Sequence, residues 1–179
     1  MMINSLCSSL EKEVEERSGE KVRLCYQCGK CSNGCLFNFA MDILPHQVMK
    51  LVQYGQKERL LRSHTIWLCA ACETCTARCP NDIDVARVMD TLRQMALEEG
   101  VKPSERIIPL FHRCFLGNIK VTGRISEPIL MGSYKTLSGD LFTDMELALE
   151  MLKKGKIKLL PSVIKNRREL RRIFKETRP

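Results

Sequence analysis

The sequence predicts an all-α fold, and two observations lead to that class. Apolar residues recur at helical spacing along most of the first half of the chain. Two cysteine runs of identical spacing are each followed by one of these helical stripes, and the long stretch between them is itself helical in pattern. The two halves of this region therefore look like a degenerate repeat, in which a cysteine loop is followed each time by a helix.

Eight of the ten cysteines stand in the two runs. The runs are Cys25-x2-Cys28-x2-Cys31-x3-Cys35 and Cys69-x2-Cys72-x2-Cys75-x3-Cys79. This is the spacing of bacterial ferredoxins, and it predicts two [4Fe–4S] clusters. Three closely spaced thiolates can each reach a different iron of one cubane, and the fourth iron needs a cysteine from further away.

The ligand sets follow from the same pattern. In two-cluster ferredoxins the fourth cysteine of each run ligates the other run's cluster. The expected sets are Cys25, Cys28, Cys31 and Cys79 for cluster 1, and Cys69, Cys72, Cys75 and Cys35 for cluster 2. Pro80 follows the second run, whereas Leu36 stands at that place in the first, so Cys35 is the weaker match.

Zinc and disulfides are the other common uses of clustered cysteines. Structural zinc prefers two separated Cys-x2-Cys pairs or mixed Cys and His ligands, which fits a third cysteine in each run poorly. Disulfides would suit a secreted chain, and residues 1–17 show no apolar signal stretch. Cys7 and Cys114 stand alone, and we expect both to be buried thiols.

The first expected helix is capped by Asn4 or Ser5 and ends at Ser18-Gly19. Its apolar face consists of Ile3, Leu6, Leu10 and Val14. After the first run, Pro45 suits the first turn of a helix with Val48, Leu51 and Val52 on one face. A short helix is expected from Lys57 to Arg62.

Side chains near the runs carry further expectations. Tyr26, Phe37 and Phe39 either shield the first cluster from water or belong to an ordinary core. We expect Trp67 to pack beside the second cluster, and His46 to be a surface or hydrogen-bonded core residue rather than a ligand.

After Pro80, Asp82 or Asp84 is expected to cap a helix that ends at Gly100. Its stripe is Val85, Val88, Met89, Leu92, Met95 and Ala96. Beyond it the signals weaken: Pro109 would interrupt a helix begun at Ser104. Residues 117–139 are turn-rich and predict a loop or extended arm, and a basic helix is expected from Ser162 to Lys175.

Charge and missing motifs limit the function. The formal net charge is +8, and between Lys153 and Arg178 eleven Lys or Arg stand against two Glu. No nucleic-acid motif accompanies them, so a solvated face or a docking surface for an acidic protein is the better interpretation. No nucleotide-binding fingerprint or catalytic triad is visible, and no apolar run approaches a membrane span. We therefore expect a cytoplasmic electron carrier without catalytic residues, membrane partner or nucleic acid.

The stretches CYQCGKCSNGC and IWLCAACETCTARCPNDIDVARVM resemble the α-helical ferredoxin module of several oxidoreductase subunits. The resemblance divides the chain into an N-terminal helix over residues 1–20, a two-cluster domain over residues 21–100, and a basic docking region over residues 101–179. Unlike succinate dehydrogenase iron–sulfur subunits, the chain has only a short helix before the module.

Together with the tail TDMELALEMLKKGKIKLLPSVIKNRRELRRIF, the module resembles the two-cluster iron–sulfur subunit of heterodisulfide reductase. The resemblance implies an electron relay from the flavin-containing subunit to the subunit that reduces the disulfide of coenzyme M and coenzyme B in methanogenesis. A hydrogenase or formate dehydrogenase can belong to such an assembly. The alternatives are an electron-transfer component of another flavin-dependent oxidoreductase complex and a free-standing ferredoxin; a structural zinc module is a third class.

Overall fold

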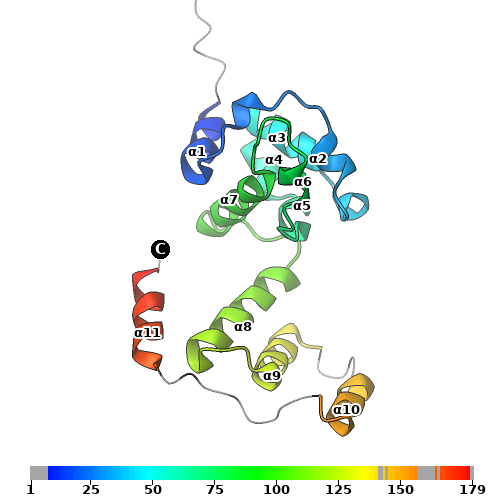
Figure 1. The fold of residues 1–179 in the computed structure, drawn as a ribbon, viewed down its shortest axis with the longest axis vertical. Helices are drawn as coiled ribbons and strands as arrows, with labels where there is room; N and C mark the ends of the chain where they lie inside the picture. Colours follow the sequence, from blue (N-terminus) through cyan, green and yellow to red (C-terminus); the bar gives the residue numbers. More distant parts are fainter. Residues whose placement is uncertain (1–7, 141–142, 144, 157–163, 165, 178–179) are drawn as a thin grey trace, which may run out of the picture. The chain divides into compact units, whose positions relative to one another are not determined.

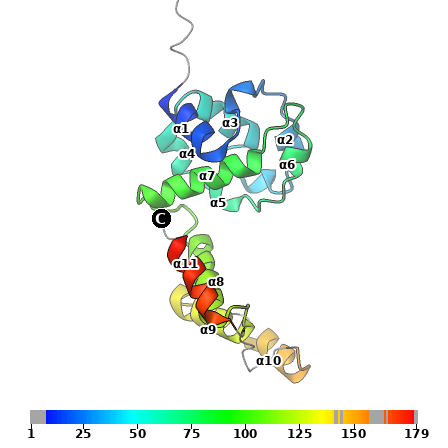
Figure 2. The ribbon, with the colours of Figure 1, turned by 60° about the vertical axis from the view of Figure 1, so that its left-hand side comes forward.

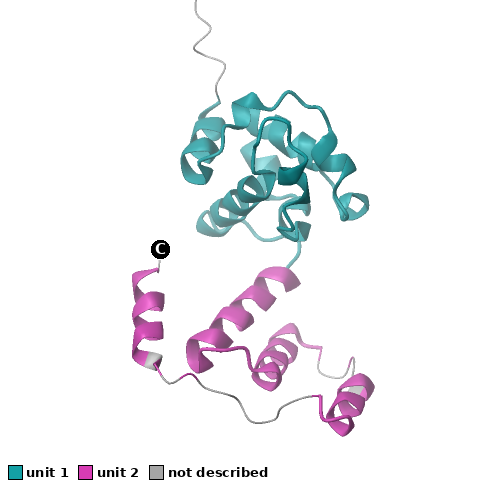
Figure 3. Ribbon diagram, in the orientation of Figure 1, with its two compact units in different colours: residues 1–106 teal, residues 107–179 magenta. Residues whose placement is uncertain are grey.

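The computed structural model describes residues 8–140, 143, 145–156, 164 and 166–177, and within them every regular element is a helix. The predicted all-α class is confirmed. The chain forms two compact units, residues 1–106 and 107–179 (Figure 3). The helices of the first unit are α1 Ser9–Ser18, α2 Lys30–Asn33, α3 Pro45–Gln53, α4 Lys57–Leu61, α5 Thr65–Leu68, α6 Thr74–Ala77 and α7 Val85–Glu98, with short 3-10 helices at Val22–Leu24 and Asn38–Ala40 (Figure 1).

Helix α1 begins later than the sequence suggested. Its N-cap is Ser8, whose Oγ accepts the N–H of Glu11 at 3.0 Å and donates to the carbonyl of Val52 at 2.9 Å. The expectation of a cap at Asn4 or Ser5 was therefore wrong, and the cap is instead a serine that also contacts α3. Residues 3 and 6 and Cys7 lie outside the described residues. The end of the helix is as predicted, with Gly19 in the left-handed conformation at φ 75°.

Helix α7 carries the core of the first unit. It runs along one side of the unit, and α1, α4, α5 and α6 pack against it (Figure 2). All six residues of its predicted apolar stripe are buried: Val85, Val88, Met89, Leu92, Met95 and Ala96. Val48 and Val52 of α3 are also fully buried, and Leu51 is half-buried. Asp84 caps α7 by accepting the N–H of Arg87 at 3.0 Å, as one of the two predicted caps.

The second unit corrects two expectations. Its helices are α8 Ile107–Thr122, α9 Glu127–Ser138, α10 Met145–Lys153 and α11 Arg167–Glu176. Because α8 begins at Ile107, Pro109 lies in the first turn. Backbone N–H groups in the first turn have no acceptor within the helix, so a proline there does not interrupt it. Residues 117–139 are not a loop or extended arm but the end of α8, a short turn and α9.

A buried side chain explains why the turn-rich stretch folds as two helices. Asn118 donates to the carbonyl of Ser126 at 2.7 Å and accepts its N–H at 3.1 Å, which closes the turn between α8 and α9. Cys114 is buried in this unit, as predicted. The expected basic helix is present as α11, capped by Asn166; Ser162 lies outside the described residues.

Candidate metal centre

The two cysteine runs follow the same backbone path. Cys25 and Cys69 each leave a short helical turn with extended backbone, at φ −69°, ψ 112° and φ −61°, ψ 117°. Each run then forms a one-turn helix, α2 and α6, which contact each other. The degenerate repeat predicted from the sequence is therefore present in the backbone.

Left-handed residues occur at matching places in both loops. Gln27 and Ala71 have φ of 66° and 50°, and Gly29 and Glu73 have φ of 74° and 58°. Such conformations cost non-glycine residues about 1 kcal/mol or more, so they persist only where the surroundings require them. Alternation of left- and right-handed residues turns successive N–H groups into a concavity that accepts anionic sulfur.

One pocket brings cysteines of the two runs together. Cys35, from the first run, lines it beside three cysteines of the second. The full lining is Cys35, Phe37, Met41, Pro45, Cys69, Ala70, Cys72, Thr74, Cys75, Val85, Ala86 and Met89. Burial raises the pKa of the Cys69 thiol, and the charge of Cys35 adds to that rise. The expected ligands of cluster 2 thus surround one apolar cavity.

The last cysteine of the second run lies toward the first run. Desolvation raises the pKa of the Tyr26 phenol, and the thiolates of Cys28 and Cys79 add to the rise. Cys79 therefore lies within electrostatic reach of the side chain that follows Cys25.

The third cysteines of the two runs, Cys31 and Cys75, interact electrostatically with each other. Burial raises the pKa of Cys31 to about 11, with smaller contributions from Cys25 and Cys75. Burial likewise raises the pKa of Cys75, with an opposing hydrogen bond from Thr76. A buried thiol with a raised pKa stays protonated when no metal is bound, and it releases its proton when it binds a metal. These positions therefore favour the thiolate only when a cation is bound.

Clusters and a single zinc ion differ in the arrangement of sulfur ligands that they need. Among the described residues, no three His, Cys, Asp or Glu side chains converge on one point as ligands of a single metal ion. Tetrahedral zinc would require four sulfurs at about 2.3 Å from one centre. A cubane instead spreads its thiolates over four irons, and the two runs together offer eight cysteine thiols.

Polar side chains contact cysteine sulfurs in both runs. Gln27 donates through Nε2 to Cys25 Sγ at 3.3 Å, and Thr74 Oγ1 lies 3.5 Å from Cys72 Sγ. The Thr74 contacts lower the pKa of Cys72, the exposed thiol of its run. Hydrogen bonds to sulfur and solvent exposure are the means by which a protein tunes cluster potentials.

The aromatic residues near the first run are less buried than expected. Tyr26 is 61% exposed and Phe39 84% exposed, so neither belongs to the core. Phe37, 39% exposed, lines the pocket beside Cys35. Trp67 is buried in α5, just before the second run, and its packing beside the second cluster stays a prediction.

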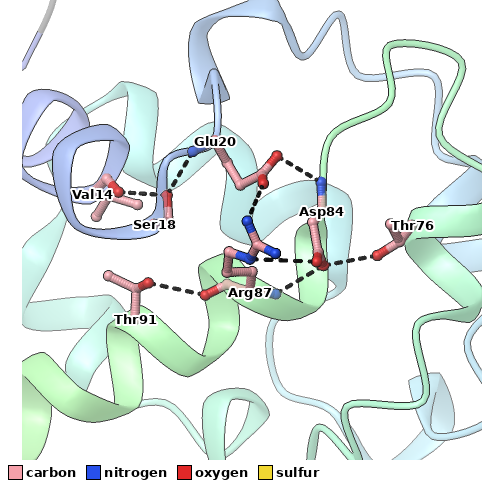
Figure 4. A network of polar contacts seen from close by, with 7 residues as sticks. All are labelled: Val14, Ser18, Glu20, Thr76, Asp84, Arg87 and Thr91. Carbon is pink, nitrogen blue, oxygen red and sulfur yellow. Dashed lines mark hydrogen bonds and ion pairs between the residues drawn. The ribbon is translucent and has the colours of Figure 1, made fainter.

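The residue after each third cysteine ties its short helix to the next long helix. Ser32 Oγ accepts the N–H of His46 at 3.0 Å and pairs with the ring Nδ1 at 2.7 Å. His46 is thus a hydrogen-bonded residue, as predicted. In the second half, Thr76 donates to Asp84 at 2.9 Å (Figure 4).

Charged groups extend the tie in the second half. Glu20 accepts the N–H of Asp84 at 2.9 Å and pairs with Arg87 at 3.2 Å (Figure 4). The segment after α1 is thereby fixed to the start of α7. In the contacts described for the first half, no carboxylate is paired with Ser32 or His46 in the way that Glu20 is paired with Asp84 and Arg87.

Sequence reasoning missed two side chains that hold the runs. Gln53, at the end of α3, donates to the carbonyls of Val22 and Cys25 at 3.0 and 3.1 Å. Arg93, on α7, donates to the carbonyls of Ile66 and Cys69. We call Gln53 and Arg93 the clamp residues. The repeat itself was the available signal, because both occupy the same place in their halves.

Comparison with known proteins agrees with this geometry. Residues 24–84 match the model of the family described as a 4Fe–4S dicluster domain. This segment is therefore similar to iron–sulfur domains that hold two clusters. The matched range contains all eight cysteines of the two runs and the turn that leads into α7.

Curated relatives extend the similarity. The chain is 26% identical to the iron–sulfur subunit of the CoB–CoM heterodisulfide reductase of Methanopyrus kandleri, over 61% of this chain and 57% of the relative. It is 33% identical to an iron–sulfur subunit of the corresponding reductase of Methanocaldococcus jannaschii, over 55% of this chain and 52% of the relative. One component of the H2:CoB–CoM heterodisulfide,ferredoxin reductase of Methanothermobacter marburgensis is 25% identical over 58% of each chain.

The chain spans about half the length of the curated relatives it matches. The predicted resemblance to the iron–sulfur subunit of heterodisulfide reductase is confirmed, and the matches support an electron-transfer role in association with an oxidoreductase. None of the helices in the described part of the chain combines the length and apolarity that a membrane crossing requires.

Proposed function

We propose that this chain binds two [4Fe–4S] clusters and relays electrons within a heterodisulfide reductase-type complex. The observation that carries the proposal is the pocket in which Cys35 joins cysteines of the other run. A cubane needs a fourth ligand from a distant part of the chain, and the crossed arrangement supplies it. The proposed ligand sets are Cys25, Cys28, Cys31 and Cys79, and Cys69, Cys72, Cys75 and Cys35.

The protein residues would hold and tune the clusters rather than perform bond chemistry. When bound, such a cluster supplies one-electron oxidation and reduction. Four thiolates fill the ligand positions of a cubane, which suits electron transfer rather than substrate binding at iron. Cys31 and Cys75 interact electrostatically across the runs, so crossed ligation would keep the two clusters close.

The resemblance to heterodisulfide reductase suggests the direction of electron transfer that we propose. The donor would be a flavin-containing subunit, and the acceptor would be the subunit that reduces the coenzyme M–coenzyme B disulfide. One relative, from Methanococcus maripaludis, is named as part of an H2/formate:CoB–CoM heterodisulfide,ferredoxin reductase. A hydrogenase or formate dehydrogenase is therefore the proposed source of electrons for the assembly.

Exposed side chains beside the runs suit contact with such partners. Cys28 and Cys72 are exposed, one in each run. Tyr26, Leu36 and Phe39 are largely exposed near the first run. Apolar groups around a redox centre support subunit docking at short electron-transfer distance, because apolar interface area is removed from water on association.

The basic C-terminal segment is the second proposed docking element. Helix α11 is rich in arginine and exposes Ile173 as well as its charges. Deleting residues 162–179 should release a partner subunit in co-purification while iron content stays unchanged. Retention of the complex at moderate salt after this deletion would assign the tail to a solvated face.

Reconstitution tests the relay. Donor and acceptor subunits should reduce heterodisulfide only when this protein is added, and the Cys72→Ser variant should not restore turnover. Cys114→Ser, which changes a buried cysteine of the second unit, is the matched control and should restore it. Undiminished activity without this protein would overturn the proposal.

A further inference from the structure

The clamp residues occupy equivalent positions in the two halves. Each lies nine residues after the N-cap of its helix, Leu44 in α3 and Asp84 in α7. Each donates to two carbonyls that are three residues apart, and the second of them belongs to the first cysteine of the run. In both halves, therefore, a side chain at the same position of the repeat donates hydrogen bonds to the carbonyls at the start of the cysteine run.

The two solutions differ in charge. Gln53 has a neutral amide, whereas Arg93 has a positively charged guanidinium. The Arg93 side chain is only 14% exposed, so water screens it weakly. Its hydrogen bond to the carbonyl of Cys69 places this charge next to a thiolate of the second run.

Neighbouring charges reduce this field without cancelling it. Asp90 pairs with Arg93 at 2.8 Å, but its carboxylate is 47% exposed and lies partly in water. The equivalent position on α3 is Lys50, whose Nζ lies 4.7 Å from the centroid of the exposed Tyr54 ring. Lys30 and Arg78, the cations within the two cysteine loops, are both exposed. Arg93 is thus the shielded cation of the clamp pair.

We propose that Arg93 is a positioning residue that raises the reduction potential of cluster 2 above that of cluster 1. The inference rests on the proposed pair of clusters. A cluster gains one negative charge on accepting an electron, and a shielded cation nearby stabilises that state. Electrons therefore move from the Cys25 half to the Cys69 half, with no proton exchanged by Arg93.

The test is a redox titration of the anaerobically purified, cluster-loaded full chain, followed by electron paramagnetic resonance. Cys28→Ser and Cys72→Ser identify the signal of each cluster. Arg93→Gln removes the charge and keeps an amide donor, which Gln53 shows can reach both carbonyls from this position. It should lower the potential of cluster 2 alone. A unit charge roughly 10 Å from a redox group at a dielectric constant of about 20 shifts the electron distribution by about tenfold.

Two further variants separate charge from structure. Arg93→Lys should keep most of the wild-type difference between the clusters, and Asp90→Asn should widen it. If Arg93→Gln loses iron, Asp90→Asn and Arg93→Lys still decide the matter through the potentials. Unchanged potentials in Asp90→Asn, or an equal shift of both clusters in Arg93→Gln, would overturn the inference. A wild-type chain without two cubanes would instead overturn the proposed function.

Discussion

The two halves of the first unit share a backbone and differ in their polar contacts. Both have left-handed residues at the same two positions of the cysteine loop, and both have a clamp from the following helix. The first half uses partners without a carboxylate or guanidinium, namely Gln53 and the Ser32–His46 pair. The second uses charged ones, including Arg93 and the group formed by Glu20, Asp84 and Arg87.

The repeat keeps the backbone geometry of the cysteine loops and varies the charge of the side chains that hold them. Loop geometry is fixed by the need to present thiols to a cluster, so the backbone angles agree closely. The groups that hold the loop only need to donate or accept hydrogen bonds, so their charge is free to change. A chain that must make two similar centres unequal can do so through these contacts while the loops stay alike.

Replacement of single cysteine ligands by serine is expected to have the largest effect, which is on the iron content of the protein. If ligation is crossed, Cys79→Ser should damage the same cluster as Cys28→Ser, and Cys35→Ser the same cluster as Cys72→Ser. Each variant should lose up to half of its iron, because one of two cubanes loses a thiolate. Iron and sulfide analysis with electron paramagnetic resonance measures both quantities. Matching of Cys79→Ser with Cys72→Ser would mean that each run serves its own cluster.

Removal of the clamps is expected to have the next largest effect. Gln53→Ala and Arg93→Ala each remove a side-chain donor from two carbonyls, and a buried carbonyl left without any donor costs about 1–3 kcal/mol. The carbonyl of Val22 still accepts the N–H of Cys25 at 3.0 Å after Gln53→Ala. Arg93→Ala should cost more, because hydrogen bonds from a charged donor are the stronger ones. Urea unfolding of the cluster-loaded protein, with the rate of iron release to a chelator, would measure this. A larger loss in Gln53→Ala would contradict the ranking.

The ties between the short and long helices should differ by less. Asp84→Ala removes a helix cap and the acceptor of Thr76, for which about 1–2 kcal/mol is expected. Ser32→Ala removes the contacts to His46 and the hydroxyl that hydrogen-bonds the Cys31 thiol, and should cost about 1 kcal/mol. Thermal unfolding compares the two, and Asp84→Asn, which can still cap, is the control. Equal losses would mean that the charged tie adds nothing.

Glu73 offers the smallest effect. It adopts the left-handed conformation that Gly29 has in the first loop. Glu73→Gly should therefore stabilise the protein by up to about 1 kcal/mol, through relief of strain. Gly29→Ala should destabilise it by a similar amount, since a Cβ there meets no atom within 4 Å and only the backbone conformation is at issue. Opposite signs in denaturant midpoints are the expected result, and equal signs would contradict it.

Features that depend on local spacing were predictable from the sequence. The all-α class, the stripe of α7, the cap at Asp84 and the end of α1 at Gly19 all follow from residues close together in the chain. Features that depend on distant partners were not. Ser8 caps α1 because Val52 of α3 accepts its hydroxyl, and no local pattern distinguishes it from Asn4 or Ser5.

The second unit shows the same limit. Glycines at 117 and 132 and the turn near residue 123 suggested a loop, but the buried hydrogen bonds of Asn118 with Ser126 join two helices there. In the candidate site, the cysteines were identifiable by spacing alone. The clamp residues were not, because Gln53 and Arg93 contact carbonyls more than twenty residues earlier in the chain.

The measurement that tests the central claim most directly is the iron and sulfide content of the anaerobically purified full chain. Two cubanes predict about eight iron and eight acid-labile sulfide per chain. The same sample should contain no stoichiometric zinc. Four iron and four sulfide, or one zinc per cysteine run, would contradict the claim that the two halves hold one cluster each.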